Sequence, residues 1–107
     1  MLITTTPMVE GRKIQEYKGP VFSQATRGMG LIRGIGAGWK TMTGGRSSGQ
    51  EQSIVEVRKI ALEEITQEAK ALGANAIVGL NIDVEILSNE GTCIIFCKTF
   101  GTAVVIV

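Results

Sequence analysis

The sequence predicts a small α+β domain in which one long helix packs on an antiparallel sheet, with β-α-β-β as its central order. Apolar residues recur at spacings of three and four through residues 50–72, which is typical of a helix that covers a core. Apolar and polar residues alternate through 76–87, which is typical of a strand. A loop at 88–91 and a second apolar run at 92–100 then predict a hairpin. The length of 107 residues fits a single domain over residues 1–107.

The N-terminal part predicts three short strands. Residues 2–6 form a β-branched run that ends at a proline, so we expect a strand at a sheet edge, where a missing N–H is tolerated. Residues 13–17 and 21–27 predict two further strands, and Gly19-Pro20 between them predicts a turn.

Most of the 14 glycines fall in residues 28–49. Apolar residues in this segment have helical spacing, which predicts a short helix weakened by its glycines: Leu31, Ile32, Ile35, Trp39 and Met42. Residues 34–41 resemble a phosphate-binding loop, but Trp39 stands where that motif needs glycine directly before lysine. We therefore do not assign a nucleotide site here.

The helix at 50–72 has matching signals at both ends. Ser48 and Glu51 stand at capping-box spacing before the apolar stripe, and Gly73 follows its last residue, where a left-handed cap favours glycine. The stripe consists of Ile54, Val57, Ala61, Ile65, Ala69 and Leu72.

The last strand, at 92–100, continues through 102–107 after Gly101, which is a candidate bulge. Its two sides are both apolar: Ile94, Phe96 and Phe100 on one, and Cys93, Ile95 and Cys97 on the other. One helix covers only one face of a small sheet. We therefore expect a neighbouring subunit to cover the second face.

Composition excludes several classes of protein. The net charge of +1 argues against a nucleic-acid binder, and the absence of histidine excludes Ser-His-Asp and Cys-His nucleophiles. We see no signal peptide and no apolar run long enough to span a bilayer, so we expect no membrane association. With two cysteines and no disulfide framework, a cytoplasmic location is expected. The charge is split, with a net +6 over residues 11–46 and a net −5 over 51–90, which favours head-to-tail pairing of subunits or packing of the two segments within one chain.

Two sets of residues are candidate binding sites. The first precedes the long helix, where free amides and an arginine can hold an anion or small metabolite: Gly44, Gly45, Arg46, Ser47 and Ser48. A plain capping loop is the simpler interpretation of these residues. The second is the pair Cys93 and Cys97. Four residues along a strand span about 13 Å, so one copy of the pair cannot chelate one ion, whereas equivalent cysteines around a ring axis could. Two buried structural cysteines are the alternative.

The polar row Asn81, Asp83 and Glu85 lies on one side of its strand. It is either a solvated sheet face or a cation site.

Several segments together resemble the YbjQ-like family over nearly the whole chain. These are Thr4-Thr5-Thr6-Pro7, Val9-Glu10-Gly11, Glu16-Tyr17-x-Gly19, Gly44-Gly45-Arg46-Ser47, Leu72-Gly73-Ala74-Asn75-Ala76-Ile77-Val78-Gly79 and Gly101-Thr102-Ala103-Val104.

The resemblance implies a subunit fold similar to dodecin, a homopentameric ring and a heavy-metal-binding label, with no established activity. Cys93, Cys97 and the glycine cluster at 34–38 depart from the family's pattern. Taken together, we expect a non-enzymatic ring that binds a small ligand or ion at its subunit interfaces. The alternatives are anion binding at the helix start and binding of a divalent or heavy-metal ion through the cysteines.

Overall fold

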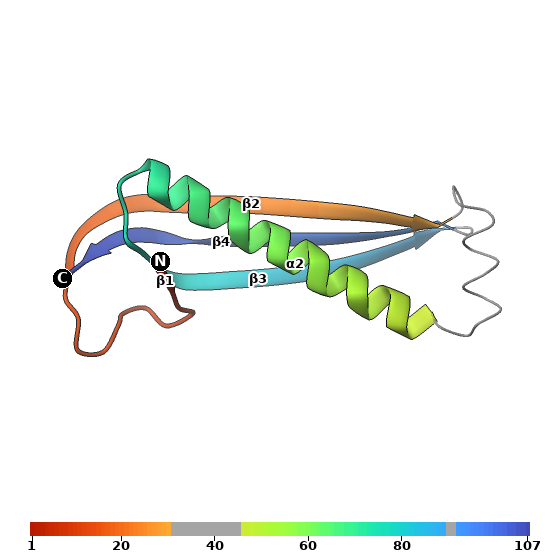
Figure 1. Cartoon of the computed structure of the whole chain (residues 1–107), viewed down its shortest axis with the longest axis horizontal. Helices are drawn as coiled ribbons and strands as arrows, with labels where there is room; N and C mark the ends of the chain where they lie inside the picture. The colour runs from red at the N-terminus through yellow and green to blue at the C-terminus, as the bar shows by residue number, and fades with distance from the viewer. Residues whose placement is uncertain (31–45, 90–91) are drawn as a thin grey trace.

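The computed structural model describes residues 1–30, 46–89 and 92–107. In these ranges a four-stranded sheet has the order β1-β3-β4-β2, and one helix, α2, crosses one of its faces (Figure 1). The elements are β1 (Leu2–Ile3), β2 (Ile14–Gly30), α2 (Arg46–Ala71), β3 (Ala76–Asn89) and β4 (Thr92–Ile106). The predicted β-α-β-β centre is confirmed as β2-α2-β3-β4.

The sheet is mixed, so the prediction of a wholly antiparallel sheet is corrected. β1 pairs in parallel with β3, while β4 is antiparallel to both β3 and β2. β1 is an edge strand, as predicted, but it is shorter than residues 2–6. Its pairing is extended by hydrogen bonds from the amides of Gly79 and Leu80 to the carbonyls of Thr6 and Thr4.

β2 is one continuous strand, so the predicted turn at Gly19-Pro20 is wrong. The chain instead shifts register against β4 between Tyr17 and Gly19, and Gly19 has a φ of 120°, a conformation that glycine adopts without a steric penalty. Pro20 is tolerated because β2 is at the edge of the sheet. A Gly-Pro pair often ends a strand in a turn, but in this protein it accompanies a bulge within one continuous strand.

The predicted bulge at Gly101 lies in the partner strand instead. The register between β3 and β4 shifts between Val78 and Asn81, and Gly79 has a φ of 62°. Gly101 lies against this bulge, because a Cβ placed on it would be 2.9 Å from Ile77 Cγ2 and 3.2 Å from the Val78 carbonyl oxygen. Glycine is needed at position 101 because β3 approaches β4 closely there, and not because β4 contains an extra, bulged residue.

The long helix is confirmed, with a different start. α2 begins at Arg46, so Ser48 lies inside its first turn and the predicted capping box is not at the helix end. The C-terminal end matches the prediction. Gly73 has a φ of 85°, its amide donates to the Lys70 carbonyl (2.9 Å), and the Ala74 amide donates to the Ala69 carbonyl (3.0 Å), which is a Schellman cap.

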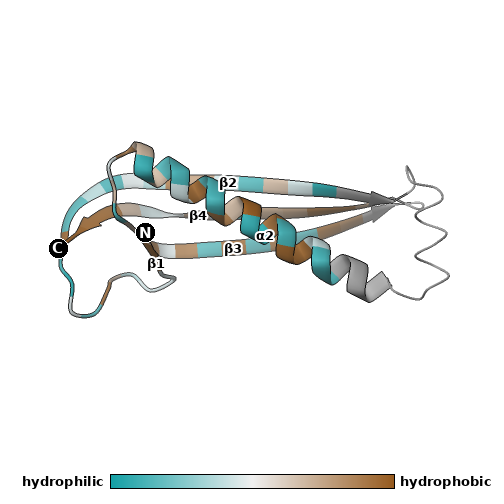
Figure 2. Ribbon diagram, in the orientation of Figure 1, coloured by the Kyte–Doolittle hydropathy of each residue, from teal (hydrophilic) through white to brown (hydrophobic). Residues whose placement is uncertain are grey.

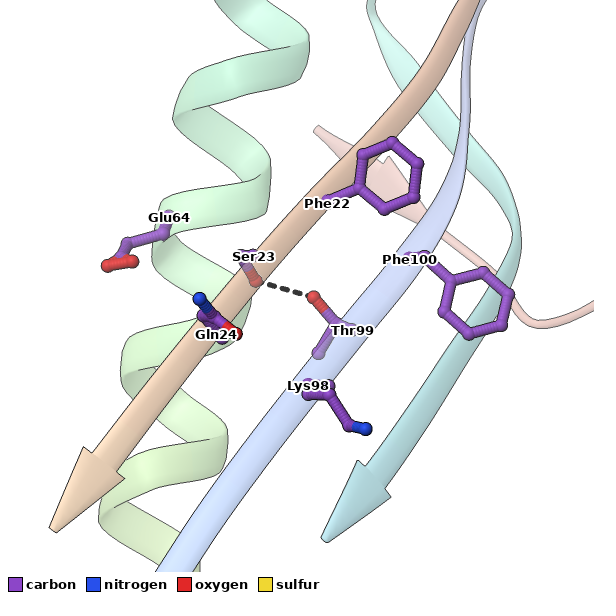
Figure 3. Close-up of a pocket in the computed structure, with 7 residues that line it drawn as sticks. All are labelled: Phe22, Ser23, Gln24, Glu64, Lys98, Thr99 and Phe100. Carbon is purple, nitrogen blue, oxygen red and sulfur yellow. Dashed lines mark hydrogen bonds between the residues drawn. The ribbon is translucent and has the colours of Figure 1, made fainter.

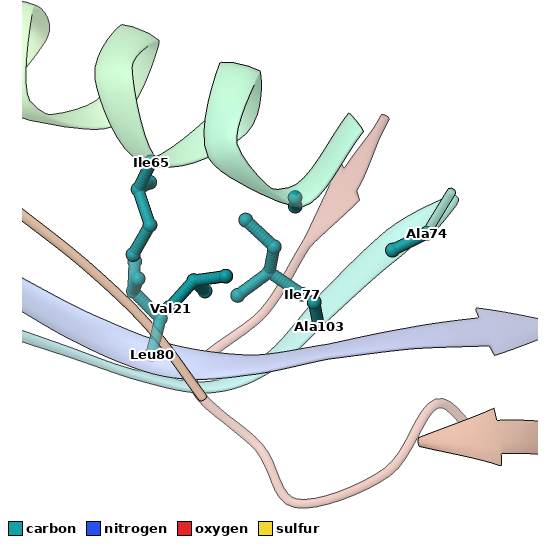
Figure 4. Packing of buried hydrophobic residues seen from close by; sticks show 7 residues of the cluster. Val21, Ile65, Ala74, Ile77, Leu80 and Ala103 are labelled. Atoms are coloured by element: carbon teal, nitrogen blue, oxygen red, sulfur yellow. The ribbon is translucent and has the colours of Figure 1, made fainter. Parts of the chain in front are cut away.

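The apolar stripe of α2 packs on the sheet in two clusters, while its last member, Leu72, is exposed. In the first cluster, Ile65 and Ala69 contact a set of residues from the strands: Val21, Ile77, Leu80 and Ala103, with Ala74 beside them (Figure 4). In the second, Val57 and Ala61 contact Ala25, Ile95 and Cys97. Brown apolar segments recur along α2, β3 and β4 in Figure 2, as this packing requires.

The expected short helix among residues 31–42 and the loop-like motif at 34–41 lie outside the described residues. No helix in the described ranges combines the length and apolar character that crossing a membrane requires.

Candidate functional site

The sheet face opposite α2, called the far face here, is built by alternation along β2, β3 and β4. Ile95 and Cys97 of β4 pack against α2, so the residues between and beside them point to the far face. Directly paired residues share a face, and the register therefore gives rows across β2, β4 and β3: Phe22-Phe100-Asn81, Gln24-Lys98-Asp83, Thr26-Phe96-Glu85, and Ile94-Leu87 across β4 and β3. Apolar and polar rows thus alternate on this face.

One end of the far face is covered by the chain itself. Ala76, Val78, Val104 and Ile106 are buried there against Val9 of the N-terminal segment and Ile14 at the start of β2. The residues predicted to need cover on this face, Ile94, Phe96 and Phe100, lie toward the other end and are half buried or exposed, so their burial by a neighbouring subunit stays a prediction.

The other end is open. The exposed fractions are 60% for Phe22, 48% for Phe100, 55% for Leu87 and 44% for Ile94. In the part of the chain that the structure describes, nothing packs over these four side chains. We call the residues of the four rows above the open half of the far face.

A hollow of about 470 Å³ lies beside β2 and β4, lined by Phe22, Ser23, Gln24, Glu64, Lys98, Thr99 and Phe100 (Figure 3). The hydroxyl groups of Ser23 and Thr99 already have hydrogen-bond partners within the protein. Ser23 donates to the Ala61 carbonyl at 2.6 Å, so the 2.5 Å contact between Ser23 Oγ and Thr99 Oγ1 is donated by Thr99. The polar groups that remain for a ligand are the side chains of Gln24, Glu64 and Lys98.

The charged residues of the open half are only loosely paired. Lys98 Nζ lies 4.0 Å from Asp83 Oδ2 and 5.5 Å from the centre of the Phe96 ring, and both charged side chains are about half exposed. Exposed pairs of this kind contribute little to stability. Asp83 and Glu85 therefore remain accessible beside the apolar rows.

In the described ranges, one ion pair joins the basic and the acidic segments of the sequence. Arg27 of β2 donates to Glu56 of α2 at 2.8 Å. The other two ion pairs in these ranges, Lys18–Glu16 within β2 and Lys98–Asp83 between β4 and β3, do not connect the two segments.

The structure describes only three of the five residues of the predicted anion site. Arg46, Ser47 and Ser48 form the first turn of α2, not the loop before it, and this turn contains no acidic residue. Gly44 and Gly45 lie outside the described residues. The first-turn amides of a helix lack partners within the helix, so this end carries the positive end of the helix dipole.

The two cysteines do not form a metal site within one chain. Neither forms a disulfide, Cys97 is buried among Val57, Ala61 and Ile95, and Cys93 is half buried. Burial raises the pKa of the Cys97 thiol, and Asp83 raises it further against the opposing effect of Arg58. A thiol that holds its proton is a poor ligand. Among the described residues no three His, Cys, Asp or Glu side chains come together.

The role of β2 in the open half was not predicted. The sequence predicts residues 21–27 only as a strand, and the structure adds that Phe22, Gln24 and Thr26 supply the β2 side of three of the four rows. The alternation of small residues at Val21, Ser23 and Ala25 with larger ones between them is the signal that identifies the two faces.

The fold and its open half define a class: a small α+β protein in which the described residues leave half of one sheet face uncovered. Over residues 1–107 the chain matches the YbjQ family model, described as "Putative heavy-metal-binding". The chain belongs to this family, which confirms the resemblance seen in the sequence.

Curated relatives and a solved structure agree with this assignment. The chain is 46% identical to a UPF0145 protein of Pasteurella multocida and 42% identical to one of Clostridium kluyveri, each over 99% of both chains. A crystal structure from Pediococcus pentosaceus, titled a protein with unknown function of the DUF74 family, superposes with a TM-score of 0.61 at 19% identity, covering 100% of this chain and 98% of that one. That likeness shows the fold.

Proposed function

We propose that the protein is a non-enzymatic, cytoplasmic protein that assembles into a ring of about five copies and binds a small ligand or ion where the subunits meet or near the ring axis. The observation that carries this proposal is the open half of the far face. Its exposed apolar side chains, Phe22 and Phe100 at one end and Ile94 and Leu87 at the other, are uncovered within the described chain.

The energetic argument concerns four side chains. Phe22, Phe100, Leu87 and Ile94 each keep about half of their surface in water. Burying a large apolar side chain contributes about 1.5–3 kcal/mol, so removing these surfaces from water in every copy favours association by several kcal/mol. Contiguous apolar surface on a small protein marks an interaction site.

The polar rows explain why we expect a ligand at this interface. Asp83, Glu85 and Lys98 lie between the apolar rows with weak mutual pairing. An assembly that brings these rows from several copies together creates a partly enclosed, charged space.

The test is the oligomeric mass, measured by mass photometry and by light scattering. The wild-type chain should have about five times the monomer mass at micromolar concentration, and Phe22→Ser should dissociate toward the monomer. The matched control is Val55→Ser on α2, which removes a similarly exposed apolar side chain (52% exposed) from outside the far face and should keep the wild-type mass. A wild-type monomer would refute the proposal.

A second candidate is anion or small-metabolite binding at the start of α2. It is favoured by the placement of Arg46, Ser47 and Ser48 in a first turn with no acidic residue. Inorganic phosphate titrated to millimolar concentration should shift the backbone amide resonances of residues 44–50, and Arg46→Gln should weaken the effect. Unchanged resonances in this segment would eliminate the candidate.

A further inference from the structure

The hollow beside β2 and β4 changes in chemical character from one end to the other. The rings of Phe22 and Phe100, which are paired directly across β2 and β4, line one end. The side-chain amide of Gln24 follows on β2, and Glu64 of α2 lines the other end. Figure 3 shows the two rings on one side of β2 and Glu64 on the other. A ligand that fits this hollow therefore combines an apolar body with a polar end.

The polar end is acidic and lacks a cation. Glu64 has no ion pair in the described ranges. Its neighbours on the helix surface, three and four residues away, include no lysine or arginine, whereas Glu68 is among them and adds a second negative charge. Arg27 of β2 is already paired with Glu56 of α2. The charge that this end of the hollow offers to a ligand is therefore negative.

Lys98 does not neutralise this end. Its ammonium group lies 4.0 Å from the Asp83 carboxylate and 5.5 Å from the centre of the Phe96 ring. Figure 3 shows this group directed away from Gln24 and Glu64. The same contacts show an ammonium group held between a carboxylate and a phenyl ring on this sheet, which is the arrangement that Phe22, Phe100 and Glu64 offer to a ligand.

We propose that the hollow binds an organic ammonium ion, whose apolar body lies on the rings of Phe22 and Phe100 and whose ammonium group pairs with Glu64. Aromatic faces attract cations as well as apolar groups, and the Gln24 amide oxygen can accept a hydrogen bond from the ammonium group. The volume of about 470 Å³ suits a small molecule. The inference rests on the proposed function, because both rings belong to the open half that the proposed ring brings together, and it names the class of ligand.

An anionic ligand fits the hollow less well. The hydroxyl groups of Ser23 and Thr99 already donate within the protein, so they are not free donors for an anion. Lys98 shares its charge with Asp83, and Glu64 would repel an anion at the other end. An anion would therefore have to compete with Asp83 for the single cation that lines the hollow.

The experiment compares three probes that share one apolar body and differ in charge: 3-phenylpropylammonium, 3-phenylpropanol and 3-phenylpropionate. Each is titrated into the untagged full chain, and binding is followed by ligand-detected NMR, which suits a weak ligand on a large assembly. The ammonium probe should bind most tightly, the alcohol more weakly and the carboxylate most weakly. Added salt should weaken binding of the ammonium probe and leave binding of the alcohol unchanged.

Two variants test the two ends of the hollow. Glu64→Gln should weaken binding of the ammonium probe about threefold and leave the alcohol unchanged, because an exposed ion pair is lost. Phe22→Leu should weaken the ammonium probe by a similar factor of about three, because leucine keeps the apolar surface but removes the aromatic face. The matched control is Glu63→Gln. Glu63 is exposed on α2 beside Glu64 but does not line the hollow, so this variant should bind like the wild type.

Mass photometry of the same samples separates this inference from the proposed ring, because Glu64 lies outside the far face and Glu64→Gln should keep the wild-type mass. A wild-type oligomer that binds none of the probes, or binds the carboxylate at least as tightly as the ammonium, would refute the inference and leave the ring standing. Equal loss of ammonium binding in Glu63→Gln and Glu64→Gln would refute the assignment to this hollow. A wild-type monomer that shows the expected order of probes would refute the ring and support the ammonium site.

Discussion

At the scale of single residues, the buried hydroxyls make the most specific contact between α2 and the sheet. Thr99 is 2% exposed and donates to Ser23, which donates to the Ala61 carbonyl. The direction of this relay follows from the single proton on each hydroxyl. It fixes where α2 lies along β2 and β4, which an apolar stripe alone does not.

The relay makes Ser23 the more costly position to change. Ser23→Ala leaves the buried Thr99 hydroxyl without its acceptor, so we expect a loss of about 1–3 kcal/mol in the free energy of unfolding. Thr99→Val removes one hydrogen bond but leaves Ser23 bonded to Ala61, so we expect a loss of about 1 kcal/mol. Urea denaturation followed by circular dichroism compares the two. A larger loss for Thr99→Val would contradict the direction of donation.

Cys97 should make stability fall at alkaline pH. Because burial raises its pKa in the native state, the unfolded chain loses the thiol proton at a lower pH than the folded chain. The stabilisation is complete below the ordinary thiol pKa and is lost as the pH rises toward the raised native value. Unfolding of the wild type and of Cys97→Val should therefore diverge in pH dependence above the ordinary thiol pKa, with the variant less sensitive. Parallel curves would contradict this account.

The metal content of the purified protein follows from the same residues. Cys97 is buried and protonated, and the described residues bring no third ligand to the cysteines. Protein purified without an affinity tag should contain far less than one Zn, Cu or Ni per chain when measured by mass spectrometry of the elements. One equivalent that is lost in Cys93→Ser would instead show that the cysteines of several copies bind metal together.

At the scale of elements, periodic patterns were predictive, whereas of the local signals the cap at Gly73 was correct and those at Gly19-Pro20 and Ser48-Glu51 were not. The apolar stripe of α2 and the alternation along β3 each involve many residues, and the structure confirms both elements. Gly19-Pro20 and Ser48-Glu51 are signals of two residues each, and each has more than one structural outcome. A bulge in β2 replaced the expected turn, because pairing with β4 continues on both sides of Gly19-Pro20. Four more residues of helix, from Arg46, replaced the expected cap.

Gly101 tests the bulge of β3 directly. In Gly101→Ala the new methyl would lie 3.2 Å from the Val78 carbonyl oxygen and 3.3 Å from Leu80 Cα, which are backbone atoms that cannot move alone. We expect a loss of about 1–3 kcal/mol in the free energy of unfolding. Gly79→Asn is the comparison, because Gly79 has open space and asparagine tolerates its positive φ, so the loss should be smaller. Equal stability of Gly101→Ala and the wild type would show that the strands separate at little cost.

At the scale of the whole molecule, the chain is long and thin, measuring 54 × 22 × 17 Å. The sequence predicted a second face in need of cover from the apolar residues of β4 alone. It did not indicate which end of that face the N-terminal segment covers, because this depends on where Val9 and Ile14 reach after β1. It indicated the edge position of β1 from the proline after residues 2–6, but not that β2 lies at the other edge, since this depends on strand order.

If the core of one chain is completed by other copies, folding and assembly are coupled by mass action. The midpoint of thermal unfolding should then rise with protein concentration, because the unfolded state is monomeric and the native state is not. We expect this rise for the wild type over a hundredfold range of concentration, and a lower midpoint with little concentration dependence for Phe22→Ser combined with Phe100→Ser. Differential scanning fluorimetry measures both. Val55→Ser should follow the wild type, because its side chain lies outside the far face. A wild-type midpoint that does not change with concentration would mean that a single chain is stable with half of its far face in water, and that the apolar rows serve a partner other than a second copy.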